Sequence, residues 1–117
     1  MEETIIKKTI EIPMEEISKW ERLMNLDPGM IDLEEEGIDV QEPVLAMWTA
    51  DFGDGFEADI KVCLSVGWDN LPAIWCEGVF FQDGAELYHT ELEYELTGEW
   101  NFPEVDGKRY SVEVVGK

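Results

Sequence analysis

The chain has 117 residues, of which 44% are hydrophobic, and its 28 acidic and 8 basic side chains give a formal net charge of −20. Five Trp, five Phe and three Tyr exclude a disordered acidic chain, and the charge makes nucleic acid and anionic membranes poor partners. The length suits a single domain. The N-terminus, MEETIIKKTI, does not resemble a signal peptide, and no run approaches the roughly 18 apolar residues of a membrane span, so we expect a cytoplasmic protein.

The negative charge is concentrated in the middle of the chain. Residues 23–107 contain 21 acidic side chains and one base, Lys61. The flanking parts balance each other, at −2 for residues 1–22 and +2 for residues 108–117. The whole charge of −20 therefore lies in residues 23–107, and a basic protein surface or cations would be attracted to it.

A strand is predicted at residues 4–12 and an amphipathic helix at residues 13–25. Pro13 suits the first turn of a helix, where its missing N–H costs nothing, and the sequence Asp-Pro-Gly at 27–29 ends the helix. Apolar side chains recur at helical spacing and should cover an apolar surface. They are Ile17, Trp20, Leu23 and Met24.

An acidic loop is predicted at residues 27–42, which contain seven acids and no base. A helical turn at 31–36 is expected within it. Its apolar side chains could attach the loop to the core.

Two hairpins are predicted in the centre of the chain. The first joins residues 43–52 to 56–66 through a three-residue loop of Gly53, Asp54 and Gly55. Its expected pairs make one face entirely apolar: Phe52 with Phe56, Ala50 with Ala58, Trp48 with Ile60, and Ala46 with Val62.

The second hairpin follows a turn at residues 67–72 and joins strands at 73–82 and 85–96 through Asp83-Gly84, a strong two-residue turn signal. Its expected pairs are Val79 with Tyr88, Trp75 with Leu92, and Ala73 with Tyr94.

A last turn at residues 105–107 leads to a strand at 109–115. Together these elements predict an α+β fold, a twisted, mostly antiparallel sheet of five to six strands packed on one N-terminal amphipathic helix. Residues 1–117 are expected to form a single domain with the acidic loop at 27–42.

The outer face of this sheet is predicted to carry rows of carboxylates. The stretch HTELEYEL, residues 89–96, alternates with a period of two and places three glutamates on one side. Asp51 falls opposite Glu57, although facing like charges destabilise a sheet by roughly 0.2–1 kcal/mol. Carboxylates two residues apart on a strand lie about 6.6–6.8 Å apart, on the scale of the phosphate spacing in nucleic acid. Nine carboxylates are predicted to bind Lys and Arg of a partner: Glu34, Glu35, Glu36, Asp51, Glu57, Asp59, Glu91, Glu93 and Glu95.

Three alternatives to an acidic binding surface remain open. The acidity could serve only solubility, and carboxylates on edge strands discourage aggregation.

Glu77 is expected on the apolar face, opposite Val62, where it could act as a general acid in a small enzyme or ligand-binding domain, or could be hydrogen-bonded at the end of the sheet. Phe80 and Leu87 are expected to face outward, as an interface or beneath another element.

Catalytic and metal-binding motifs are lacking. There is no nucleophile elbow, no glycine-rich phosphate loop, and residues 51–59 fail the EF-hand pattern. Cys63 is expected opposite Cys76, with both as free thiols. We therefore expect a non-enzymatic protein without cofactor or metal.

In size, acidity and α+β pattern, the chain resembles small DNA-mimic proteins of phages and mobile elements, which include anti-restriction and anti-CRISPR inhibitors. Acidic immunity proteins that neutralise basic nuclease toxins are similar in bulk. The resemblance implies an inhibitor that occupies the nucleic-acid-binding surface of a basic protein. The alternative is an immunity-like or antitoxin-like protein that depends on a few buried hot spots.

Overall fold

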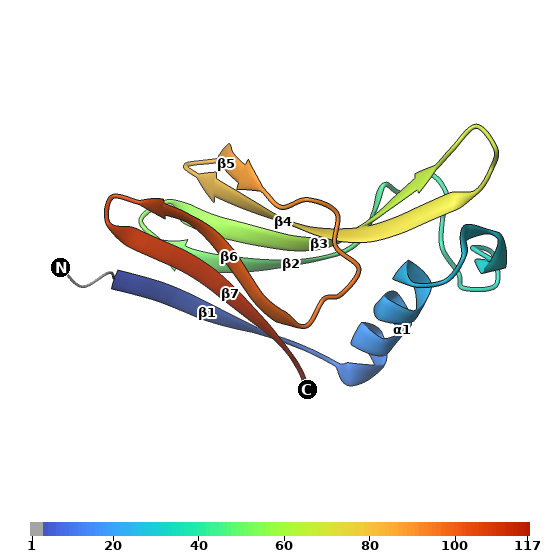
Figure 1. Ribbon diagram of the computed structural model, residues 1–117, viewed down its shortest axis with the longest axis horizontal. Helices are drawn as coiled ribbons and strands as arrows, with labels where there is room; N and C mark the ends of the chain where they lie inside the picture. Colours follow the sequence, from blue (N-terminus) through green and yellow to red (C-terminus); the bar gives the residue numbers. More distant parts are fainter. Residues whose placement is uncertain (1–3) are drawn as a thin grey trace.

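The computed structural model describes residues 4–117, which contain one α-helix, one short 3-10 helix and seven strands (Figure 1). In chain order they are β1 (Thr4–Ile12), α1 (Met14–Met24), η1 (Pro28–Met30), β2 (Val44–Gly53), β3 (Phe56–Val66), β4 (Pro72–Gln82), β5 (Ala85–His89), β6 (Gly98–Val105) and β7 (Lys108–Gly116). The predicted α+β class is confirmed.

The strands form two sheets. In the first, β2, β3, β4 and β5 pair in this order, and every pair is antiparallel. In the second, β7 lies between β1 and β6, parallel to β1 and antiparallel to β6. The predicted sheet of five to six strands is thus divided in two, because the first and last strands of the chain pair with each other and leave the central hairpins as a separate sheet.

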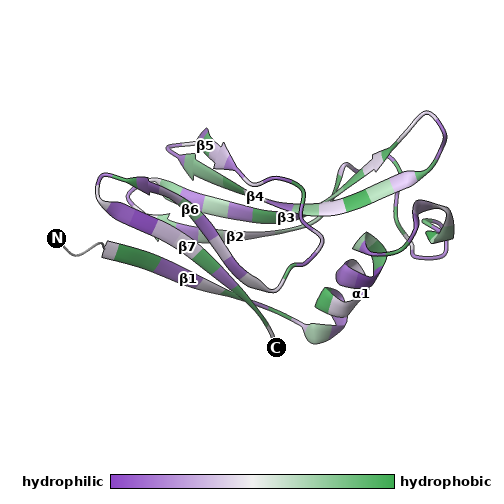
Figure 2. Ribbon diagram, in the orientation of Figure 1, coloured by the Kyte–Doolittle hydropathy of each residue, from purple (hydrophilic) through white to green (hydrophobic). Residues whose placement is uncertain are grey.

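The core is shared by both sheets and the helix. Phe80 of β4 is fully buried, and its ring lies 5.3 Å from that of Phe102 in β6 and 5.2 Å from that of Tyr110 in β7. The four buried side chains of α1 join the same core. The three-stranded sheet covers one end of the four-stranded sheet and α1 lies at the other (Figure 1). Figure 2 shows hydrophobic and hydrophilic residues alternating along the strands, as packing on one face requires.

The predicted helix at residues 13–25 is confirmed. Pro13 immediately precedes the helix, and its carbonyl accepts hydrogen bonds from the N–H groups of Glu16 and Ile17 at 2.9 and 3.1 Å. Acidic side chains at Glu15 and Glu16 lie in the first turn, where they complement the helix dipole. The end of α1 lies beside residues 90–97, because the side-chain amide of Asn25 donates a hydrogen bond to the Tyr94 carbonyl.

The first hairpin pairs as predicted along most of its length. Ala50 lies opposite Ala58, and Asp51 lies opposite Glu57. At its end, a register shift pairs Phe56 with Gly53 in place of Phe52, which leaves a two-residue turn. Both turn residues have positive φ, 53° at Asp54 and 84° at Gly55, as the tight turns of twisted hairpins require.

The predicted register between β3 and β4 is wrong by one residue. Val66 pairs with Pro72, so the loop has five residues, 67–71, one fewer than expected. A shift of one residue turns every side chain of a strand to the opposite face. Phe80, expected outside, therefore lies in the core, and Glu77, expected inside, lies on the outer face opposite Lys61.

The predicted strand at residues 85–96 ends early, at His89. Phe81 pairs with Glu86 but Phe80 pairs with Tyr88, which leaves Leu87 as an extra residue in β5. This bulge overturns the expected pairing of Tyr88 with Val79. After His89 the chain leaves regular strand geometry, with one isolated bridge between Cys76 and Glu93.

The acidic stretch at residues 27–42 is an ordered loop at the helix end of the molecule (Figure 1). Glu36 N donates to the Asp32 carbonyl at 3.1 Å, and Ile38 N donates to the Leu33 carbonyl at 2.8 Å. These bonds form turns at residues 33–37, and Leu33 and Ile38 pack against the core. Within residues 4–117 no helix has the length and apolarity needed to cross a membrane.

Candidate functional site

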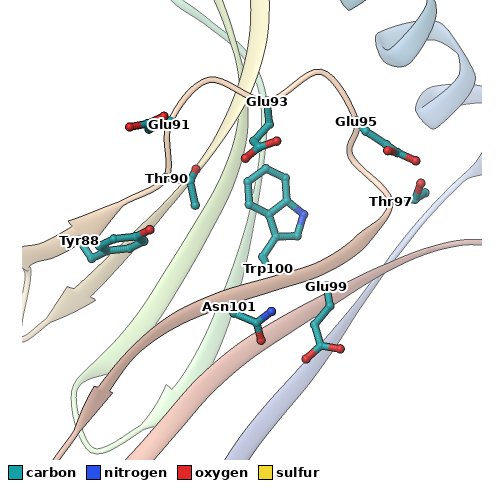
Figure 3. A pocket seen from close by; sticks show the side chains of 9 residues that line it. All are labelled: Tyr88, Thr90, Glu91, Glu93, Glu95, Thr97, Glu99, Trp100 and Asn101. Carbon is teal, nitrogen blue, oxygen red and sulfur yellow. The ribbon is translucent and has the colours of Figure 1, made fainter.

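A cleft lined by carboxylates lies between β6 and the connecting segment, residues 90–97, which joins β5 to β6 (Figure 3). We call it the acidic cleft. Its volume is about 500 Å³, and no Lys or Arg occurs among the described residues that line it. Those residues are Tyr88, Thr90, Glu91, Glu93, Glu95, Thr97, Glu99, Trp100 and Asn101.

The alternation of the connecting segment persists although the strand does not. Glu91, Glu93 and Glu95 all line the acidic cleft, whereas Leu92 and Tyr94 line a different, apolar depression. The period of two in the sequence therefore does separate carboxylates from apolar side chains. The prediction that these glutamates form a row on a regular strand is wrong, because the pairing of β5 with β4 ends at His89.

Hydrogen bonds to β4 hold the first half of the connecting segment. The N–H of Gly78 donates to the Thr90 hydroxyl at 2.8 Å, and the N–H of Thr90 donates to the Gly78 carbonyl at 2.8 Å. Cys76 and Glu93 exchange two backbone hydrogen bonds, at 2.9 and 3.0 Å. These bonds fix the backbone on either side of Glu91.

The helix and β6 hold the second half. The side-chain amide of Asn25 donates to the Tyr94 carbonyl at 3.0 Å, and Glu21 accepts a hydrogen bond from the N–H of Leu96 at 3.2 Å. The Trp100 indole donates to the Leu96 carbonyl at 3.0 Å, and the Leu96 side chain is fully buried. Three exposed carboxylates are thus carried by a backbone that is anchored at both ends.

The opposite wall of the acidic cleft comes from β6. Figure 3 shows the side chains of Glu93 and Trp100 pointing toward one another across it. Glu99 has a basic neighbour, because Lys7 Nζ lies 3.7 Å from Glu99 and 2.7 Å from Glu113. The hydrogen bond with Glu113 is the main reason that the pKa of Lys7 is raised. The three glutamates of the connecting segment are therefore the main source of negative charge in the cleft.

The sequence alone did not indicate the β6 side of the cleft. Glu99, Trp100 and Asn101 meet the connecting segment only because β6 folds back along it. Gly98, at a φ of 123°, is the available signal for that reversal, since few other residues adopt such a conformation. The identity of the wall itself depends on tertiary packing.

The carboxylates predicted on the first hairpin lie elsewhere. Asp51 and Glu57 line a shallow depression at the hairpin tips, together with Asp54 and Asp83. Asp59 accepts a hydrogen bond from the Thr49 hydroxyl across the sheet at 2.7 Å. These residues form a second acidic area, and no described contact joins it to the acidic cleft.

Glu34, Glu35 and Glu36 lie in the turn at residues 33–37, beside α1. The tips of the first hairpin lie at the other end of the molecule (Figure 1), whose longest extent is 51 Å. Glu36 is paired with Arg22, at 2.9 Å between Nη2 and Oε1. The structure therefore distributes the nine predicted residues over three areas, and it gathers only the glutamates of the connecting segment around one cleft.

Glu77 does not occupy the apolar face. Its carboxylate lies 3.9 Å from Lys61 Nζ and accepts a hydrogen bond from Cys63 Sγ at 3.2 Å. Burial raises the pKa of Cys63 to about 12, reinforced by the bond to Glu77. The premise of a general acid buried beneath the sheet is wrong, because the one-residue register error had placed Glu77 on the inner side.

The sequence predicted that the two cysteines lie opposite each other, and the structure shows that they do not. Cys63 pairs with Trp75, and Cys76 points into the core with no exposed area. Both are free thiols, and burial raises the pKa of Cys76 to about 12 as well. A thiol needs its deprotonated form to react as a nucleophile, so neither cysteine fits that role.

An apolar groove lies on the other side of the connecting segment. Its volume is about 520 Å³. The residues that line it are Leu23, Met24, Leu26, Pro28, Ile31, Ser65, Pro72, Ala73, Ile74, Trp75, Leu92 and Tyr94. Phe80 and Leu87 were both expected to face outward; Leu87 is exposed, but Phe80 is buried. The same register error explains that miss.

Among the described residues, no group of three or more His, Cys, Asp or Glu side chains is arranged to hold a metal ion. Comparisons with protein-family models, curated proteins and solved structures found no match to this chain.

Proposed function

We propose that this protein is a non-enzymatic inhibitor that occupies the nucleic-acid-binding surface of a basic protein, in the manner of anti-CRISPR or anti-restriction proteins. The observation that carries the proposal is the acidic cleft, where an anchored segment holds three glutamates without a basic side chain among the lining residues. A cytoplasmic location belongs to the same proposal, because proteins that bind DNA or RNA would be met there.

The mechanism is the substitution of carboxylates for phosphates. Lys and Arg side chains that normally grip a nucleic acid would donate charge-assisted hydrogen bonds to Glu91, Glu93 and Glu95. Because the connecting segment is already anchored, little conformational entropy is lost on binding. The net charge of −20 would steer a basic partner and make association fast and dependent on salt.

The test compares two variants of equal charge. The first replaces Glu91, Glu93 and Glu95 by Lys, and the control replaces Glu15, Glu42 and Glu104 by Lys. All six side chains are exposed, so both variants should fold, and each has a net charge of −14, because three charge reversals change −20 by +6.

Each protein is immobilised and exposed to a nuclease-treated lysate of the source organism, and proteins eluted by salt are identified. We expect nucleic-acid-binding proteins on the wild type and the control, and their loss from the cleft variant. A purified partner should release its DNA or RNA when the wild type is added. Equal capture by both variants, or a partner that holds nucleic acid and this protein together, would contradict the proposal.

A second candidate is an immunity-like protein that plugs the active site of a toxin. Trp68, in the loop between β3 and β4, is 98% exposed, and Trp is enriched among the residues that dominate binding energy. Salt separates the candidates. A nucleic-acid mimic should lose affinity steeply between 50 and 500 mM NaCl, whereas a binder that depends on Trp68 should lose affinity mainly on Trp68→Ser.

A further inference from the structure

We propose that the apolar groove is a second half of the same interface and binds large apolar side chains of a basic, amphipathic segment of the partner. This inference rests on the proposed function for the charged half. It adds that the partner is recognised by apolar contact as well as by charge. The occupant is one segment in which aliphatic or aromatic side chains on one face are flanked by Lys or Arg.

The apolar groove and the acidic cleft share the connecting segment. The connecting segment separates the groove from the acidic cleft, and alternate residues of that segment line the two sides. Leu92 and Tyr94 are 57% and 49% exposed. The hydrogen bonds that anchor the segment are made by its backbone and by Thr90, so they do not require apolar side chains at these two positions. A partner that reaches the glutamates would meet these two side chains as well.

Carboxylates surround the exposed apolar side chains of the groove. Tyr94 also lines a depression with Glu21, Glu93 and Glu95. Leu92 also lines one with Glu91, His89 and Glu77, of which Glu77 is paired with Lys61. An apolar centre with an acidic rim is complementary to an apolar side chain between basic ones.

The same charge argues against a second copy of this chain as the occupant. Two copies would bring together surfaces that belong to molecules of net charge −20, and like charges across an interface oppose association. A basic segment is attracted by the rim and is therefore the better fit.

The experiment uses two synthetic helical peptides as probes. One is built of Leu and Lys, with Leu at positions i, i+3, i+4 and i+7, and the other has the same Lys residues with Gln in place of Leu. Binding to the full chain is measured by fluorescence anisotropy at 50 and 500 mM NaCl. The groove variant is Leu92→Ser with Tyr94→Ser, and the matched control is Ile5→Ser with Met47→Ser, which removes two other exposed apolar side chains.

At 500 mM NaCl, where surface charges are screened, the Leu peptide should bind the wild type and the control roughly tenfold more tightly than the groove variant. The Gln peptide should not distinguish the three proteins. Equal binding of the Leu peptide to all three would overturn the inference, even if the cleft variant of the previous section had lost its partner. Sedimentation that reveals a dimer broken by the groove substitutions would also overturn it, by showing that a second copy is the occupant.

Discussion

The three-stranded sheet has equal numbers of acidic and basic residues, whereas the four-stranded sheet and the two acidic loops have an excess of acidic residues. Strands β1, β6 and β7 contain four basic and four acidic residues, whereas β2 to β5 contain five acids and one base. Residues 27–42 and 90–97 add ten acids and no base. In the balanced sheet Lys7 pairs with Glu113 at 2.7 Å and with Glu99 at 3.7 Å. The chain can therefore build an exposed sheet without a charge surplus, and the surplus elsewhere is not a requirement of the fold.

The comparison of the two sheets is meaningful if they unfold as one cooperative unit. Substitution of Phe80, which contacts both sheets, tests this and has the largest expected effect. Phe80→Ala should lower the free energy of unfolding by about 3–5 kcal/mol, because it leaves a cavity where rings from both sheets meet. Urea unfolding followed by far-ultraviolet circular dichroism and by Trp fluorescence should give coincident transitions for the variant. Two separate transitions would divide the molecule into independent parts.

The anchoring of the connecting segment is tested by a pair of variants at Glu21. Glu21→Ala removes the acceptor of the Leu96 N–H and should cost about 1 kcal/mol, with faster hydrogen exchange at Leu96. Glu21→Gln retains a carbonyl oxygen and should preserve the protection. If the Leu96 N–H exchanges at the wild-type rate in both variants, Glu21 does not fix the connecting segment.

The thiols predict the alkaline limit of stability. The pKa of Cys63 is raised from 9.0 to about 12 in the folded protein, so above pH 9 the unfolded chain loses this proton while the folded chain keeps it. The stabilising contribution is complete below pH 9 and is lost as the pH rises toward 12. Urea midpoints measured at pH 8, 9 and 10 should fall less steeply for Cys63→Ala than for the wild type. Parallel slopes would contradict the buried, neutral thiol.

The smallest effect concerns salt. Repulsion among unpaired carboxylates should make the wild type more stable in 500 mM than in 20 mM NaCl, with a rise in Tm of a few degrees. Replacing Glu91, Glu93 and Glu95 by Gln should reduce that rise more than replacing Glu11, Glu99 and Glu113, which neighbour lysines. Equal reductions would mean that charge repulsion destabilises the connecting segment no more than it destabilises the three-stranded sheet.

Local signals in the sequence were sufficient for most of the elements, but the strand predicted at residues 85–96 ends at His89 and β6 was not predicted. The helix after Pro13, the turn at Asp83-Gly84 and the strand after Gly107 follow from capping, positive φ and periodicity, whereas the three-residue loop predicted at residues 53–55 is a two-residue turn at Asp54-Gly55. The first hairpin was also registered correctly from Ala46 to Asp51, because its turn is short and one of its faces is entirely apolar.

The errors came from counting residues in places where the sequence leaves the count open. Residues 67–72 read as a turn of six, but Pro72 pairs with Val66 and shortens it to five. That single residue reversed the faces of β4 and misplaced Glu77 and Phe80. The pairing of β1 with β7 joins the two ends of the described chain, and no local pattern specifies it. The β6 wall of the acidic cleft was missed for the same reason.

The extra residue at Leu87 has a consequence for how such a surface could change. Since Glu91, Glu93 and Glu95 line the acidic cleft and Leu92 and Tyr94 line the apolar groove, removing one amino acid before them would exchange the two sets. The glutamates would then be presented where Leu92 and Tyr94 are now, although residues 91–95 themselves would be unchanged. The number of residues before the connecting segment therefore determines which of its sides carries the glutamates. A deletion of one residue there would show how much recognition depends on that side alone.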